Sequence, residues 1–147
     1  MEISDVLSED MILTDYAADS KRQLLEGISS FIAQKNHFDK SAVFEAMLER
    51  ENLGSTGYGN GVAFPHARIQ GLDKIITVFV RLNKAIDYDA MDAKPVDLLA
   101  VMVSPENSGD DHLRTLSAFS RTMNDENTRN IIRHAKNAHE IYVALHG

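Results

Sequence analysis

The chain has 147 residues, a formal net charge of −7 and no cysteine. This length suits one domain with a sizeable core, and we expect a single domain over residues 1–147. The missing cysteines exclude a disulfide framework and a cysteine-ligated metal. The acidic balance argues against nucleic-acid binding, which depends on clustered cations, and suits docking to a basic partner.

No segment is predicted to enter a membrane. The N-terminal MEISDVLSED lacks the basic and apolar regions of a signal peptide. The longest apolar run, LLAVMV at 98–103, is too short to span a bilayer. These features predict a cytoplasmic protein.

The first third of the chain predicts a short strand and two helices. MILTD at 11–15 is typical of a strand. The Ser20-x-x-Gln23 capping pattern marks the start of a helix, and a second helix is expected from near Asp39 to just before Gly54. The apolar residues of the first helix fall on one face. They are Leu24, Leu25, Ile28, Phe31 and Ile32.

The middle of the chain predicts buried strands. VAFPHA at 62–67 is short, whereas IITVFVRL at 75–82 and VDLLAVMV at 96–103 are almost wholly apolar. Such runs indicate strands that are covered on both faces of a sheet. Together with the flanking helices they predict an α/β fold, a three-layer helix–sheet–helix sandwich with a mixed β-sheet. The C-terminal helices are expected at about 110–124, 126–135 and 138–146.

The stretch GNGVAFPHAR at 59–68 contains the main candidate for chemistry, His66. Pro65 fixes its own φ near −65° and pushes Phe64 towards extended backbone, which anchors the chain beside His66. The glycines upstream permit turns with positive φ and the close approach of another molecule. A neutral imidazole can act as a nucleophile. The alternative interpretation is a hairpin that happens to carry a histidine.

Two more residues are candidates, each with a simpler structural alternative. His112 opens the helix SGDDHLRTLSAF, which Ser108 or Asp110 can cap, and a helix N-terminus attracts anions. Its alternative is a histidine at a helix start with no role. Arg50 lies in the last turn of the second helix. It either complements the helix dipole or directs its guanidinium at an oxyanion near the following loop.

Several familiar motifs are excluded. GSTGYGNG at 54–61 lacks the Gly-Lys-Ser/Thr ending of a nucleotide P-loop, and its glycine spacing does not match a dinucleotide site. His139 and Glu140 begin like a zinc-protease helix, but Val143 stands where the second histidine is required. We interpret His134 and His139 as surface residues.

The stretch LERENLGSTGYGNGVAFPHAR at 48–68 resembles the enzyme IIA domain of the bacterial phosphoenolpyruvate phosphotransferase system, in its fructose/mannitol class. AIDYDAMDAKPVDLLAVMVSP at 85–105 and HLRTLS at 112–117 fit the same family. The likeness is strongest to the nitrogen-regulatory type and runs over nearly the whole chain. Tyr58 and Arg68 differ from the residues common in the family, and so does Phe64.

The resemblance implies a role for each candidate residue. The family's phosphorylated histidine, in the Pro-His step, falls on His66, which would accept a phosphoryl group from a histidine-phosphorylated HPr-like carrier protein. The second active-site histidine falls on His112, and the phosphate-contacting arginine falls on Arg50. No metal and no cofactor is implied.

We therefore predict a regulatory phosphoryl carrier that binds protein targets according to its phosphorylation state. The alternative is a soluble IIA component of a fructose/mannitol-type sugar transporter, which passes the phosphoryl group to a IIB domain. A third interpretation is a metal hydrolase built on His66, His112 and an aspartate. We expect one regulatory partner to pack on Val62, Phe64 and Ala67 and to prefer the unphosphorylated form. The sequence leaves the target, the donor branch and the oligomeric state open.

Overall fold

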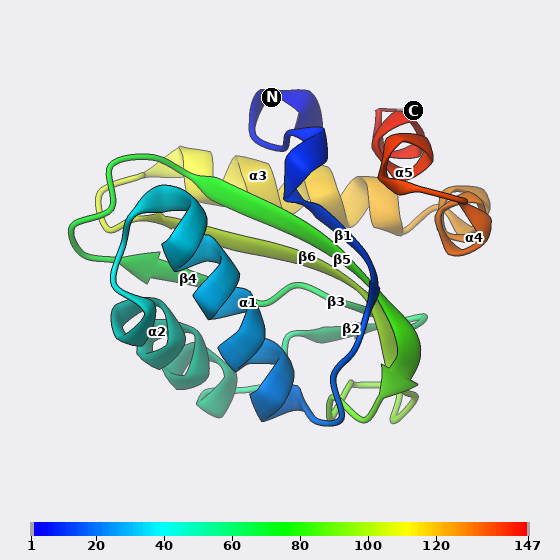
Figure 1. Cartoon of the computed structure of the whole chain (residues 1–147), viewed down its shortest axis with the longest axis horizontal. Helices are drawn as coiled ribbons and strands as arrows, with labels where there is room; N and C mark the ends of the chain where they lie inside the picture. Colours follow the sequence, from blue (N-terminus) through cyan, green and yellow to red (C-terminus); the bar gives the residue numbers. More distant parts are fainter. Residues whose placement is uncertain (1, 147) are drawn as a thin grey trace.

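The computed structural model describes residues 2–146, which contain one mixed sheet of six strands (Figure 1). The central pair, β5 and β6, runs antiparallel. β1 is parallel to β5, and both β3 and β4 are parallel to β6. The order across the sheet is β1-β5-β6-β3-β2, and β4 pairs with β6 as well. The strands are β1 (Ile12–Tyr16), β2 (Gly57–Gly59), β3 (Val62–Ala63), β4 (His66–Ile69), β5 (Ile76–Ile86) and β6 (Val96–Pro105).

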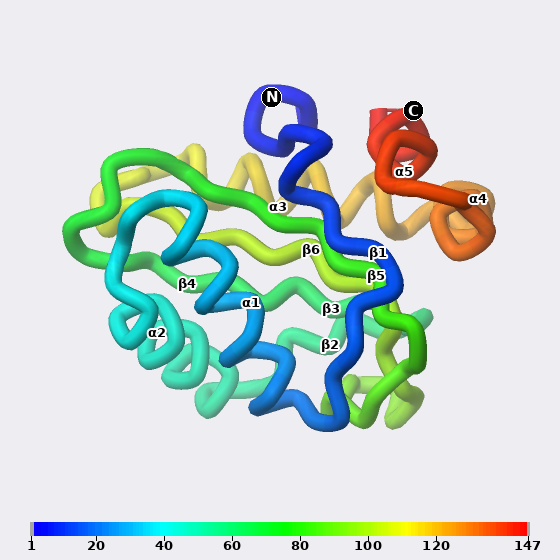
Figure 2. The backbone as a smooth tube through the Cα atoms, viewed as in Figure 1, coloured from blue at the N-terminus to red at the C-terminus, as the bar shows by residue number. Residues whose placement is uncertain are grey.

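Helices cover both faces of this sheet. They are α1 (Lys21–Asn36), α2 (Lys40–Asn52), α3 (Asp110–Met123), α4 (Glu126–His134) and α5 (Ala138–Leu145). Figures 1 and 2 show α1 and α2 together on one face, with α3 to α5 on the opposite side. None of the helices in the described part of the chain has the length and apolarity needed to cross a membrane.

Two separate hydrophobic clusters confirm the three-layer sandwich. Ile28 of α1 and Val80 of β5 belong to the first cluster. Phe79, the next residue along β5, belongs to the second cluster together with Phe119 of α3 and Ile141 of α5. Successive side chains of a strand point to opposite faces of the sheet, so β5 supplies both layers. This explains why the first half of β5 is almost wholly apolar.

The predicted starts of α1 and α2 are confirmed by their hydrogen bonds. The Ser20 hydroxyl accepts from the backbone N–H of Gln23 at 3.1 Å, and the Gln23 side chain accepts from the backbone N–H of Asp19 at 2.6 Å. The Asp39 carboxylate accepts from the backbone N–H of Ser41 at 3.1 Å. Ser20 and Asp39 thus bind N–H groups that the first turn of a helix leaves without a backbone partner, and Gln23 binds the residue before the cap.

The glycine-rich stretch folds into a short hairpin, β2–β3, whose first strand the hydropathy pattern did not predict. Asn60 and Gly61 form the turn, with φ values of 59° and 77°. Asn and Gly tolerate this left-handed region better than other residues, and an Asn-Gly pair favours a tight hairpin. Gly57 is needed for another reason, because a Cβ atom there would lie 2.7 Å from Cα of Ala90.

The strand predicted at 62–67 is divided into β3 and β4, which pair with successive segments of β6. Phe64 and Pro65 lie between the two parts. Proline has no N–H to donate to a sheet, so the ladder is interrupted there. The carbonyl of Pro65 still accepts from the backbone N–H of Met102 at 3.0 Å, which keeps this segment on the sheet. The interruption makes His66 the first residue of β4.

Candidate functional site

The imidazole of His66 is held by its own neighbouring backbone. Its Nδ1 lies 2.8 Å from the carbonyl oxygen of Phe64, and the side chain is half-buried. A carbonyl oxygen can only accept, so Nδ1 carries the hydrogen and donates it. In the neutral ring, the lone pair is then on Nε2. The sheet fixes the backbone of His66 and this bond fixes its ring.

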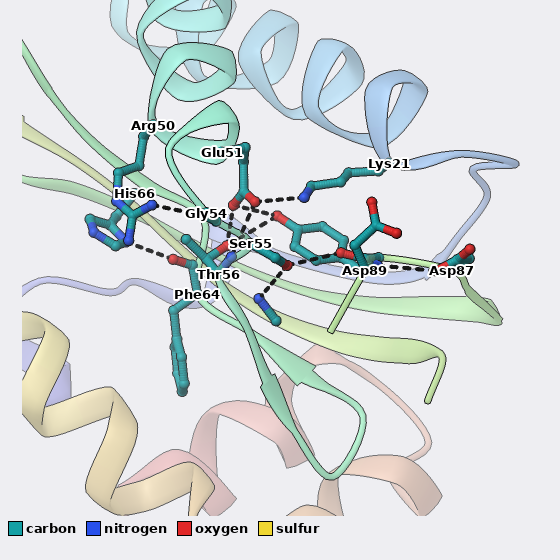
Figure 3. A network of polar contacts seen from close by, with 12 residues as sticks. Lys21, Arg50, Glu51, Gly54, Ser55, Thr56, Phe64, His66, Asp87 and Asp89 are labelled. Carbon is teal, nitrogen blue, oxygen red and sulfur yellow. Dashed lines mark hydrogen bonds and ion pairs between the residues drawn. The ribbon is translucent and has the colours of Figure 1, made fainter. Parts of the chain in front are cut away.

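Arg50 approaches His66 from the last turn of α2, as Figure 3 shows. Its Nη1 donates to the carbonyl oxygen of Gly54 at 2.9 Å. This bond ties the guanidinium to the loop that follows the helix, so Arg50 serves the helix C-terminus and also lies at the candidate site. The interpretation as a helix-end residue is confirmed by this bond, and the role towards an oxyanion stays a prediction.

His112 reaches the same place from the first turn of α3 and is only 5% exposed. The centroids of the two imidazole rings are 5.6 Å apart, at an interplanar angle of 63°. The expected cap of this helix is wrong, because Gly109 is the N-cap residue and no side chain caps it. Ser108 instead accepts from the guanidinium of Arg68. The structure thus brings His112 to His66, two residues that are distant in sequence.

Arg68 is a fourth residue of this site, and the sequence analysis did not select it. Its Nη1 donates to Oγ of Ser108 at 2.9 Å, and its Nη2 lies 3.4 Å from the carbonyl oxygen of Gly109. These bonds hold its guanidinium near the start of α3. Residues i and i+2 of a strand share one face, so the strand pattern of His66 and Arg68 was the signal that could have identified it.

These side chains line one hollow of about 400 Å³ on the surface. The three residues selected from the sequence, His66, His112 and Arg50, all lie in its wall. Its complete lining is Ala46, Glu49, Arg50, Leu53, His66, Ala67, Arg68 and His112. Two guanidinium groups beside two imidazoles form a strongly donating site, which suits a small anion with several oxygen atoms.

The surroundings keep His66 neutral. Burial is the main cause that lowers its pKa, because desolvation disfavours the cation. The charges of Arg50 and Arg68 lower the pKa further. The hydrogen bond to Phe64 and the carboxylate of Glu51 raise it, but the net direction is downward from the ordinary value of 6.5. A neutral His66 has a free electron pair at neutral pH.

The pKa of His112 is lowered further, to about 4. Burial is again the largest cause, followed by the charge of Arg68 and the interaction with His66. His112 is therefore a neutral imidazole at neutral pH. It can donate a hydrogen bond to an anion only from whichever nitrogen carries the hydrogen.

A buried polar network surrounds Glu51, the residue that follows Arg50 in α2 (Figure 3). The carboxylate of Glu51 forms an ion pair with Lys21 of α1 at 2.7 Å. It accepts from the backbone N–H of Thr56 at 3.1 Å and from the hydroxyl of Tyr88 at 2.9 Å. The hydroxyl of Thr56 is a further partner. Sequence reasoning missed this network because its members are far apart in the chain.

The expected docking surface is wrong. Val62, Phe64 and Ala67 are buried in the two clusters and present little surface to a partner. The exposed apolar side chain that lines the hollow is instead Leu53, which is 82% exposed, whereas Leu113, which follows His112 and is 61% exposed, lies outside the lining. Val62 and Ala67 are strand residues that the helices cover, whereas Leu53 lies at the C-terminal end of α2.

Other histidines take no part in this site. His134 and His139 are exposed on the C-terminal helices, as predicted. Within residues 2–146, no group of three or more His, Cys, Asp or Glu side chains is arranged to hold a metal ion. The metal-hydrolase interpretation therefore finds no ligand set in that part of the chain.

The sequence of the chain was compared with protein families and with known proteins. The family model described as "Phosphoenolpyruvate-dependent sugar phosphotransferase system, EIIA 2" matches residues 5–146. A nitrogen regulatory protein of Bradyrhizobium diazoefficiens is 37% identical over 145 residues, which cover 99% of this chain and 95% of that protein. A nitrogen regulatory protein homolog of Haemophilus influenzae is 39% identical over 146 residues, which cover 97% of this chain and 89% of the homolog.

Solved structures agree with the sequence comparison. The crystal structure of nitrogen regulatory protein IIA-Ntr from Neisseria meningitidis superposes with a TM-score of 0.92 at 32% identity, covering 97% of this chain and 98% of that one. The mannitol IIA of Escherichia coli shares the fold, with a TM-score of 0.79 at 19% identity and coverage of 95% and 98%. By sequence and by fold, the chain belongs to the EIIA 2 family of the phosphoenolpyruvate-dependent sugar phosphotransferase system, and its relatives include nitrogen regulatory proteins.

Proposed function

We propose that the protein is a phosphoryl carrier and that Nε2 of His66 is the atom that becomes phosphorylated. The observation that carries this proposal is the hydrogen bond from Nδ1 of His66 to the carbonyl of Phe64. It leaves the electron pair on Nε2, in a ring whose lowered pKa keeps it neutral. A nucleophile that is both neutral and fixed in direction suits transfer between two histidines, which depends mainly on positioning.

The transfer exchanges one nitrogen–phosphorus bond for another. The electron pair of Nε2 forms the new bond to phosphorus as the bond to the donor histidine breaks, and that bond's electrons stay on the donor ring. The donor ring takes up a proton, and the phosphorylated His66 ring releases one. Arg50 would neutralise charge on the phosphoryl oxygens during this exchange, His112 would donate a hydrogen bond to them, and the guanidinium of Arg68 is placed to help.

The donor in this proposal is a histidine-phosphorylated HPr-like carrier protein, and the readout is regulatory. Support for regulation comes from the nitrogen regulatory relatives, which match almost the full chain. The phosphorylated His66 would place a doubly charged, strongly hydrated group beside the exposed Leu53, which lines the same hollow. A partner that packs on Leu53 should therefore bind the unphosphorylated form more tightly.

A second candidate is a component of a sugar transporter. A fructose-specific EIIA component of Haloferax volcanii is 38% identical over 107 residues, covering 73% of this chain and 70% of that protein. In that case the phosphoryl group would pass from His66 to a IIB domain. Adding a purified IIB protein to the phosphorylated chain distinguishes the two, because a purely regulatory carrier should not phosphorylate it.

Intact-mass measurement tests the central proposal. The chain is incubated with phosphoenolpyruvate and the two upstream carriers, in one set from the sugar branch and in another from the nitrogen branch. We expect one phosphoryl mass on the wild type, stable in base and lost in acid, and none on His66→Ala. His134→Ala is the matched control, because it removes an exposed histidine outside the hollow and should be phosphorylated normally. A phosphorylated His66→Ala protein would show that the acceptor lies elsewhere.

A further inference from the structure

A buried serine contacts the second histidine of the site from behind. Ser104 is in β6 and is 0% exposed. Its Oγ lies 2.5 Å from Nδ1 of His112. This is the one hydrogen bond that the Ser104 side chain makes within residues 2–146. The contact joins the end of β6 to the first turn of α3, and the proposed transfer chemistry assigns no role to Ser104.

The direction of this hydrogen bond follows from the burial of Ser104. A hydroxyl has a single hydrogen, and in a buried site that hydrogen needs an acceptor. If Nδ1 of His112 donated to Oγ, the hydrogen of the hydroxyl would be left without a partner, which is costly in the interior. If the hydroxyl donates to Nδ1, both groups are satisfied. Nδ1 of His112 then carries the lone pair.

We infer that Ser104 is a positioning residue that donates its hydroxyl hydrogen to Nδ1 of His112 and thereby keeps this imidazole in the tautomer with hydrogen on Nε2. Nε2 is the ring nitrogen left for the hollow that His112 and His66 share. In this tautomer, a neutral His112 offers an N–H to the phosphoryl oxygens. In the other tautomer it would direct a lone pair at them and repel them.

The tautomer matters because His112 is not readily protonated to the imidazolium cation. Burial and the charge of Arg68 disfavour its protonation, so at neutral pH the ring has one hydrogen and one donor. The two histidines then hold complementary forms. The carbonyl of Phe64 selects Nδ1–H in His66, which frees a lone pair for attack, and Ser104 selects Nε2–H in His112, which supplies a donor. The inference rests on the proposed function only for the use of that donor.

Nitrogen NMR reads the tautomers directly, without any transfer reaction. In ¹⁵N-labelled wild-type protein at pH 7.5, correlations between ring carbon-bound hydrogens and ring nitrogens identify which nitrogen is protonated. We expect a protonated Nδ1 in His66 and a protonated Nε2 in His112. A His112 with its hydrogen on Nδ1 would overturn the inference, whether or not His66 becomes phosphorylated.

Variants of Ser104 test whether this residue is the cause. In Ser104→Ala, both ring nitrogens of His112 should move to intermediate shifts, as two tautomers exchange, while His66 keeps its wild-type pattern as an internal check on the fold. The rate of phosphoryl transfer should fall roughly two- to tenfold, the range expected for one lost hydrogen bond. Ser104→Thr keeps a hydroxyl and should restore both the tautomer and most of the rate.

Ser29→Ala is the matched control. It also removes a wholly buried serine hydroxyl, but one on α1 that has no hydrogen-bond partner in the described part of the chain, so it should behave as wild type. If Ser104→Ala leaves the His112 shifts and the transfer rate unchanged, Ser104 does not position His112. If Ser104→Ala fails to fold, the wild-type tautomer and the Ser104→Thr spectrum still decide the question. If wild type is not phosphorylated on His66, the proposed function fails, while the tautomer remains measurable.

Discussion

The guanidinium of Arg50 shows how one residue serves both structure and the proposed chemistry. It donates to the carbonyl of Gly54, yet it also lies in the wall of the hollow beside His66. A planar guanidinium can do both because its five N–H groups point in fixed, separate directions. A lysine ammonium is a single point of charge at the end of a flexible chain, and it cannot hold two partners in this geometry.

Arg50→Lys should therefore be phosphorylated more slowly. We expect a loss of about tenfold in the transfer rate, which is less than the hundredfold typical of an enclosed oxyanion site, because this hollow is open to water. Rapid-quench measurement of phosphoryl transfer gives the rate. Arg121→Lys, an exposed change on α3 outside the hollow, is the control. Equal rates for all three proteins would remove Arg50 from the phosphoryl site.

The buried state of His112 should make stability depend on pH. Its pKa is lowered from 6.5 to about 4 in the folded chain, so on acidification the unfolded chain takes up this proton first. The free energy of unfolding should therefore fall as the pH decreases from 6.5 towards 4, and His66, whose pKa is also lowered, acts in the same direction. Urea unfolding of wild type and His112→Asn measures the difference, since the carboxylates contribute equally to both. Parallel curves would contradict this account.

At the scale of elements, the carboxylate of Glu51 joins α2 to α1 and to two loop residues. It connects the end of α2 to Lys21 at the start of α1, and it binds both Thr56 and Tyr88. Burial and the neighbouring Glu51 charge raise the pKa of Tyr88, so its hydroxyl stays a donor. The loop after α2, which carries the Gly54 carbonyl that Arg50 binds, is thus fixed by the residue next to Arg50.

Glu51→Ala should destabilise the protein by about 3–5 kcal/mol, the range expected when one partner of a buried ion pair is removed. The change leaves the ammonium of Lys21, which is 20% exposed, without its anion, and it also removes the carboxylate that accepts from the Tyr88 hydroxyl. Chemical unfolding measures the loss, and hydrogen exchange should accelerate at the amide of Thr56. Glu45→Ala, an exposed change on the same helix, should stay within about 0.5 kcal/mol of wild type.

At the scale of the whole molecule, the hollow is formed where three elements converge on the end of the sheet. α2 supplies Arg50, β4 supplies His66 and α3 supplies His112. β4 is paired with β6 along its full length, and α2 packs against β4. Because each support is a packed element with a regular backbone, the site is preorganised and its response to a bound phosphoryl group should be local.

Phosphorylation should therefore change charge and leave the fold as it is. We expect the amide NMR shifts that move on phosphorylation of His66 to belong to the residues lining the hollow, Leu53 among them. Amides of β1 and α5, which have no residue in the hollow, should keep their positions. His66→Gln is the reference for changes caused by the ring alone. Shifts spread through α5 would indicate a conformational switch.

The sequence by itself determined the layers and the local starts of the helices. Runs such as those in β5 and β6 are apolar on both faces only when helices cover both sides, so hydropathy predicts a three-layer sandwich. The capping residues Ser20 and Asp39 mark α1 and α2 because their side chains bind neighbouring N–H groups, an interaction that needs no distant partner. The motif around Pro65 likewise identified the family and placed His66 in an anchored segment.

Only the tertiary structure decided which side chains meet. Ser104 and Glu51 find their partners across 8 and 37 residues of chain, and such distances have no periodicity to read. Val62 was wrongly expected to be exposed, because the burial of a strand end depends on what packs over it. Arg68 was not selected because Ser108, its partner at the start of α3, is 40 residues away in the chain. Helix caps and hydropathy patterns depend on residues that are close together in the chain, so they can be predicted from the sequence. The wall of the hollow arises from packing between distant elements.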